Sequence, residues 1–135
     1  PPAGGPIMVS ILHCADVIII PINPDGFAVA GLRFLLTELK LNILIDKTIL
    51  PTIFVLMNKA QPSNKIGTYT KETERFSDAA KIVVKRFSET YKHRALFIDK
   101  YIPETVAIKR VFKEGLPSYI NNDLHNIWKN MEEFI

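Results

Sequence analysis

Residues whose chemistry suits base recognition follow two apolar runs, and the first such group is Asn58 to Gln61 (NKAQ). An asparagine side chain can accept a hydrogen bond from the exocyclic amine of adenine and donate one to a ring nitrogen. Guanine presents two N–H donors and would need a carboxylate at the fourth position of this group to accept both. That position holds Gln61, whose amide has a single acceptor oxygen and whose NH₂ group would face the donors of guanine. The group therefore favours adenine over guanine. In the alternative interpretation, Asn58 only ties strand to loop through side-chain hydrogen bonds.

The second group follows the short apolar run Ala95–Ile98 and contains Ile102-Pro103-Glu104. A proline restricts the residue before it to extended conformations, so Ile-Pro predicts an extended turn at a strand end. Such a turn can present a flat apolar surface and backbone groups to a planar base. The alternative interpretation is an ordinary connection from a strand to a helix.

The charge of the chain is modestly basic and uneven. The net charge is +3, yet residues 1–50 hold only three Lys or Arg against four Asp or Glu, so the excess lies in the rest. Basic side chains cluster at 92–94 and at 109–113. This distribution permits contact with a polyanion, although a solvated face is the simpler interpretation of either cluster alone.

Common catalytic and metal-binding patterns are absent from the 135 residues. The sequence contains no G-x-S-x-G, C-x-x-C or H-E-x-x-H pattern and no G-x-x-x-x-G-K-[ST] phosphate loop. The only cysteine is Cys14, and the three histidines are scattered, so we predict no metal site. No apolar run is long enough to span a bilayer.

Apolar patterning predicts the elements that position these groups. Strands are expected at Val17–Ile20, Thr52–Met57 and Ala95–Ile98, and the first two read as buried on both faces. Helical spacing covers residues 29–44, a second helix follows the N-cap Thr70, and further helices are expected over Thr105–Glu114 and from Asn121 or Asn122. This alternation predicts one α/β domain over residues 1–135, with a doubly wound parallel sheet flanked by helices. Ligands of such sheets bind beyond the carboxyl ends of the strands.

The order of these motifs along the chain resembles a known family. Pro21, Pro24, Phe27, Ala28, Gly31 and Leu32 form P-x-x-P-x-x-F-A-x-x-G-L, and VLMNK, IPETV and Gly115-x-Pro117 follow in turn. This order resembles the carboxyl-terminal half of the ParA/MinD family of deviant-Walker P-loop ATPases, and the partition branch fits best. One departure is that Lys109 to Phe112 stand where the family often has an Ala-rich stretch. The resemblance implies a P-loop NTPase-like sheet, with Pro21 and Pro24 in the turn that ends a central strand.

The resemblance also implies that the chain is the carboxyl-terminal part of a larger ATPase domain. The amino-terminal half with the phosphate loop is absent, and Pro1-Pro2 match the end of the family's switch II segment. ATP and Mg²⁺ are expected in the full-length protein, whereas this segment alone is expected to be inactive and to bind neither tightly. By matching position, Asn58 would meet the adenine edge. Pro103 and Val106 would pack on the base, and backbone groups near Glu104 would hydrogen-bond it.

Partners follow from the same resemblance. Partition ATPases form ATP-dependent dimers, work with a centromere-binding protein and ride on the nucleoid, so a cytoplasmic location is expected. The candidate contacts to non-specific DNA are Lys92, Arg94, Lys109, Arg110 and Lys113. A membrane partner is not expected, because the last stretch, LHNIWKNMEEFI, carries two glutamates and one lysine. Without the strands of the amino-terminal half, an exposed strand edge would favour self-association.

Two other functions remain open at this stage. The first is a non-enzymatic binding or scaffold module, such as a truncated ParA-like paralogue that does not hydrolyse ATP. The second is an iron-protein or cluster-carrier relative of the wider family, which a single cysteine disfavours.

Overall fold

The computed structural model describes residues 5–104 together with Lys129 and Glu132. The elements in chain order are α1 (Pro6–Cys14), β1 (Val17–Ile22), α2 (Gly26–Glu38), the π-helical turn η1 (Leu39–Ile43), β2 (Thr52–Met57), α3 (Lys71–Tyr91) and β3 (Ala95–Ile98). The helices expected over 105–114 and from Asn121 or Asn122 begin outside the described residues.

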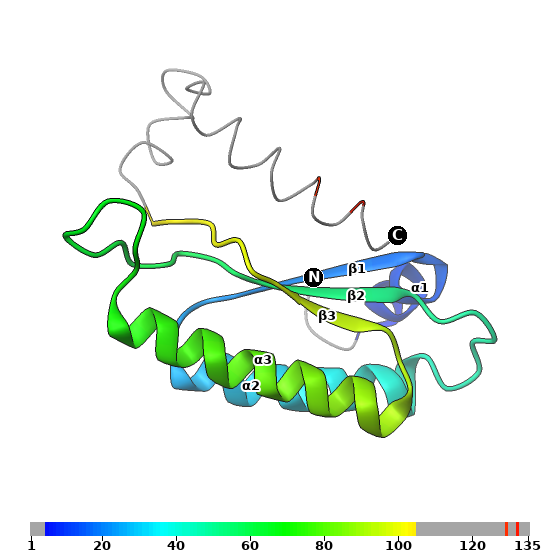
Figure 1. Ribbon diagram of the computed structural model, residues 1–135. Coiled ribbons are helices and arrows are strands. Elements are labelled where there is room, and N and C mark those ends of the chain that lie inside the picture. The colour runs from blue at the N-terminus through cyan, green and yellow to red at the C-terminus, as the bar shows by residue number, and fades with distance from the viewer. Residues whose placement is uncertain (1–4, 105–128, 130–131, 133–135) are drawn as a thin grey trace, which may run out of the picture.

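The strands form a parallel three-stranded sheet in the order β1-β2-β3. Helices α2 and α3 lie side by side on one face of this sheet (Figure 1). Parallel crossovers are nearly always right-handed, so two crossovers that step in the same direction place both helices on the same face. The parallel α/β arrangement is thus confirmed. A doubly wound sheet requires a reversal of strand order, and the described strands contain none.

Strand β1 differs from its prediction in two ways. It runs on to Ile22, so Pro21 lies inside the strand instead of ending it. Its burial also alternates, since Ile18 and Ile20 are buried whereas Ile19 is 45% exposed. The prediction that β1 is a central strand buried on both faces is therefore wrong for the sheet described. Among the described strands β1 pairs only with β2, and a proline fits at such an edge because it has no N–H to leave unpaired.

Strand β2 is the central strand and is buried on both faces, as its sequence predicts. Every residue from Ile53 to Met57 is buried. Ile53, Val55 and Met57 join a cluster with core residues of α2 and α3. The alternate residues Phe54 and Leu56 join a second cluster with Ile98. The apolar run thus reflects two-sided packing, which is typical of parallel sheets.

The helices begin at residues with clear physical signals. The Asp25 carboxylate caps α2 by accepting from the Ala28 N–H at 2.7 Å, so this helix starts slightly before the apolar pattern suggests. The Thr70 hydroxyl caps α3 as predicted and accepts from the Thr73 N–H at 3.3 Å. Helix α1 was not predicted. Its sequence, PIMVSILHC, is apolar at most positions, so it shows no alternation of an apolar and a polar face by which an amphipathic helix is recognised.

Candidate nucleotide site at the strand ends

The segments that leave β2 and β3 remain hydrogen-bonded to each other beyond the strands. The Ile102 N–H donates to the Met57 carbonyl at 2.9 Å, and the Ala60 N–H donates to the Ile102 carbonyl at 3.0 Å. Pro103 forms a parallel bridge with Ala60. The sheet pairing thereby continues past the last regular strand residue. Asn58, Pro103 and Glu104 consequently lie at the same edge of the sheet, where the carboxyl ends of the strands meet.

Asn58 is held at this edge by its backbone. Its N–H donates to the Ile22 carbonyl at 2.7 Å, which links the ends of β1 and β2. Its side chain is half-buried and makes no hydrogen bond to another residue within 5–104. The next residue, Lys59, has a left-handed backbone with φ of 53°, which is uncommon for a side chain other than glycine. The tie between strand and loop is therefore made by the main chain, and the Asn58 amide stays available for a ligand.

Glu104 and Gln61 form a contact that sequence reasoning missed. The Gln61 Nε2 donates to a carboxylate oxygen of Glu104, and the Gln61 N–H donates to the Thr73 hydroxyl at 3.2 Å. The Glu104 N–H itself donates to the Ala60 carbonyl at 2.9 Å. This N–H is therefore already paired within the chain. No local sequence pattern predicts this contact, because Gln61 and Glu104 are 43 residues apart in the chain.

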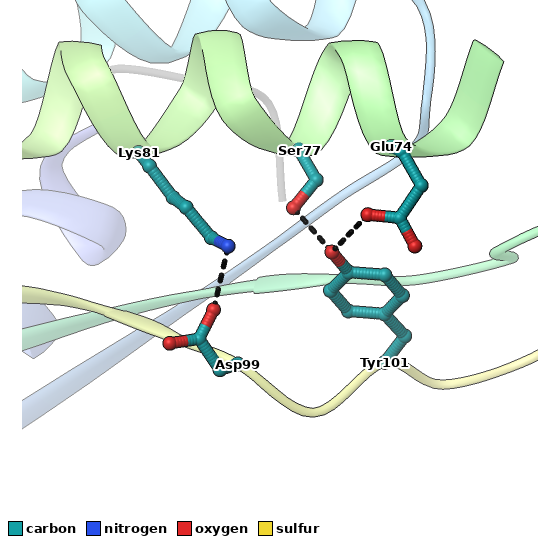
Figure 2. A network of polar contacts seen from close by, with 5 residues as sticks. All are labelled: Glu74, Ser77, Lys81, Asp99 and Tyr101. Atoms are coloured by element: carbon teal, nitrogen blue, oxygen red, sulfur yellow. Dashed lines mark hydrogen bonds and ion pairs between the residues drawn. The ribbon is translucent and has the colours of Figure 1, made fainter. Parts of the chain in front are cut away.

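A polar network fixes the segment that carries Pro103 and Glu104 to α3 (Figure 2). Lys81 pairs with Asp99 at 2.7 Å, and the Tyr101 hydroxyl contacts the Ser77 hydroxyl at 2.6 Å. Tyr101 donates to the Glu74 carboxylate at 3.3 Å, so in this arrangement Ser77 is the donor to Tyr101. The hydrogen bond to Asp99 raises the pKa of the Lys81 ammonium, and burial raises the pKa of the Tyr101 phenol. Both groups therefore keep their protons at neutral pH, and the network persists there.

Replacing Tyr101 by phenylalanine is expected to lower the free energy of unfolding by about 1 kcal/mol, because two hydrogen bonds are lost and the Ser77 hydroxyl is left without this partner. Urea denaturation measures this change. Amide hydrogen exchange at residues 99–104 is expected to accelerate, since the segment loses its anchor. The control Tyr91→Phe removes the same hydroxyl group from the last residue of α3 and is expected to leave exchange at 99–104 unchanged. Equal effects of the two substitutions would contradict an anchoring role for Tyr101.

The described candidate DNA contacts, Lys92 and Arg94, lie away from the described nucleotide candidates. Lys92 ends α3 with φ of 52°, and Arg94 directly precedes β3, where its carbonyl accepts from the Ile53 N–H at 3.0 Å. Both side chains are exposed, but His93 between them is buried. The described basic pair thus sits at the edge where strands begin, opposite Asn58 and Pro103. The other candidates, Val106, Lys109, Arg110 and Lys113, lie outside the described residues.

Within the part of the chain that is described, no group of three His, Cys, Asp or Glu side chains is arranged to hold a metal ion. No described helix is both long and apolar enough to cross a membrane. Comparisons with protein-family models, with curated proteins and with solved structures find no match to this chain.

Proposed function

We propose that this chain forms the adenine-side part of an ATP-dependent DNA-partition ATPase of the ParA/MinD type. The order of its motifs supports this proposal, and one structural observation carries it. The segments after β2 and β3 are hydrogen-bonded to each other, so that Asn58 and Pro103 share one edge of the sheet. Ligands of parallel α/β sheets bind beyond this edge.

Each residue of the site has a distinct role in the proposal. The half-buried Asn58 amide accepts from the exocyclic amine of adenine and donates to a ring nitrogen. The ring of Pro103 packs on the base, and backbone groups near Glu104 hydrogen-bond it. Glu104 keeps its carboxylate on Gln61 and thereby holds the two segments together. Val106 is added to this set by the resemblance alone.

ATP would supply the free energy that closes a dimer on DNA and, when hydrolysed, releases it. In this proposal the phosphate loop and Mg²⁺ belong to a longer polypeptide that contains this chain. The residues described here bind and orient the base and contribute no group to phosphoryl transfer. Lys92 and Arg94 remain candidates for contact with the DNA backbone, on a different edge from the base.

Nuclear magnetic resonance of the 135-residue chain tests the base contact directly. Millimolar adenosine is expected to shift the side-chain amide resonances of Asn58 and the backbone amides of residues 102–104, because these groups line the proposed base site. Guanosine is expected to shift them less, since Gln61 replaces the carboxylate that guanine requires. The substitution Asn58→Ala should weaken adenosine binding about tenfold, the cost of one or two hydrogen bonds to a ligand.

The matched control for this experiment is Asn64→Ala, which removes the same amide from an exposed position in the loop between β2 and α3. This variant is expected to bind adenosine as the unchanged chain does. If adenosine moves no resonance near Asn58, or if both variants bind it equally, the adenine-site proposal is wrong.

A further inference from the structure

A groove of about 270 Å³ runs between α2 and α3. These two helices lie side by side on one face of the sheet (Figure 1). Leu36 of α2 and Phe87 of α3 form its floor, with 1% and 6% of their surfaces exposed. Val83 and Tyr91 line it as half-buried side chains. The groove therefore offers an apolar floor that is open to solvent from one side.

Two arginines from different helices flank this floor. Arg33 of α2 and Arg86 of α3 both line the groove and are exposed. Within residues 5–104 neither forms an ion pair, and the remaining lining residues, Thr37 and Thr90, are uncharged. Among the described residues that line the groove, two positive charges thus lie beside an apolar surface and no carboxylate is present.

We infer that this groove docks a short acidic segment of another protein. One apolar side chain of the segment would rest on Leu36 and Phe87, and flanking Asp or Glu carboxylates would pair with Arg33 and Arg86. Guanidinium groups bind carboxylates through paired, charge-assisted hydrogen bonds, so the two arginines set the spacing that the partner must match.

The dimensions and chemistry of the groove favour a peptide over other anionic ligands. Its lining on α3 runs from Val83 to Tyr91, which is about 12 Å along a helix at about 1.5 Å per residue. Nucleic-acid interfaces are polar and rich in basic residues, whereas the floor of this groove is apolar and two arginines flank it.

This site is independent of the proposed nucleotide site. The groove lies on the helical layer between α2 and α3, whereas Asn58 and Pro103 lie at the carboxyl ends of the strands. Peptide docking therefore needs no nucleotide, and it can succeed or fail whatever happens in the adenosine experiment.

Fluorescence anisotropy with the 135-residue chain tests the docking site. The probe is a fluorescein-labelled peptide, Ala-Glu-Glu-Phe-Leu-Glu-Glu-Ala, which combines an apolar pair with flanking carboxylates. We expect saturable binding that weakens with added salt, because paired charges contribute to it. Arg33→Glu and Arg86→Glu should each weaken binding at least about tenfold, since each removes a charge-assisted contact and adds repulsion. The neutral variant Arg86→Gln should weaken binding less and keeps the test valid if a charge reversal unfolds the chain.

Lys85→Glu is the matched control, because it makes the same charge change on α3 at an exposed residue outside the groove. It is expected to leave peptide binding within about twofold of the unchanged chain, which is the size of a general charge effect. A peptide with Gln in place of Glu, and one with Ser in place of Phe and Leu, should both bind weakly. The inference is overturned if Lys85→Glu weakens binding as much as Arg86→Glu, or if the Glu and Gln peptides bind alike. Binding of labelled duplex DNA that depends on Arg33 and Arg86, with no peptide binding, would overturn it as well.

Discussion

Phe54→Ala is expected to lower the free energy of unfolding by about 3–5 kcal/mol, the usual cost of emptying the site of a buried aromatic ring. Phe54 has no exposed surface and lies at the centre of the middle strand. Its side chain belongs to the cluster with Leu56 and Ile98, on the face of β2 opposite the cluster that includes α2 and α3. Such a loss is a large part of the about 5–15 kcal/mol by which domains are stable.

Urea denaturation followed by circular dichroism measures this effect, and the dependence on denaturant should stay unchanged if only stability is altered. The matched control is Phe27→Ala. Phe27 is the same residue type but is 93% exposed at the start of α2, so its replacement should change stability by less than about 0.5 kcal/mol. Similar costs at the two positions would show that Phe54 is not packed as described.

Lowering the pH from about 7.5 to about 5.5, across the usual range of histidine titration, is expected to destabilise the chain through His93. This imidazole is 2% exposed, and its Nε2 lies 2.7 Å from the Pro51 carbonyl. A carbonyl oxygen can only accept, so Nε2 carries the proton of the neutral ring. Nδ1 is buried without a partner among the described residues, and protonation there would create an N–H without an acceptor.

The sign of the effect follows from the pKa of His93. Burial lowers this pKa below its usual value of 6.5, the hydrogen bond to Pro51 opposes the shift, and the charge of Lys40 adds to it. The unfolded chain therefore binds more protons at this site, and the folded state loses stability as the pH falls below about 6.5. Well above that pH, His93 is neutral in both the folded and the unfolded chain, so the free energy of unfolding no longer depends on its titration. The loss through one proton is at most about 1.4 kcal/mol per pH unit.

The variant His93→Gln tests this prediction, because it removes the titrating group while its amide can still donate to Pro51. Its free energy of unfolding is expected to change less between the two pH values than that of the unchanged chain. His13→Gln is the control, since His13 is exposed on α1 and should leave the pH dependence as it is. An unaltered pH dependence in His93→Gln would rule out His93 as the source.

Local signals in the sequence were sufficient for the central strand and for the helix that follows it. The run TIFVLM is apolar at every position from Ile53 onward, which suits only a strand that is covered on both faces. Thr70 predicted the start of α3, because a hydroxyl at that position can satisfy an N–H of the first turn. The placement of Asn58 and Pro103 at one sheet edge was also foreseeable, since parallel strands share the edge at which they end.

Tertiary structure alone decided the features that depend on distant partners. The run in β1 is as apolar as the one in β2, yet β1 lies at an edge of the described sheet and exposes Ile19. Gln61 and Glu104 are in contact although they are 43 positions apart. Arg33 and Arg86, also more than 40 positions apart, line the same groove. Local patterns report which side of an element is apolar. The way the crossovers stack the helices on the sheet decides which element covers that side. It also decides which charged side chains of different elements lie close together.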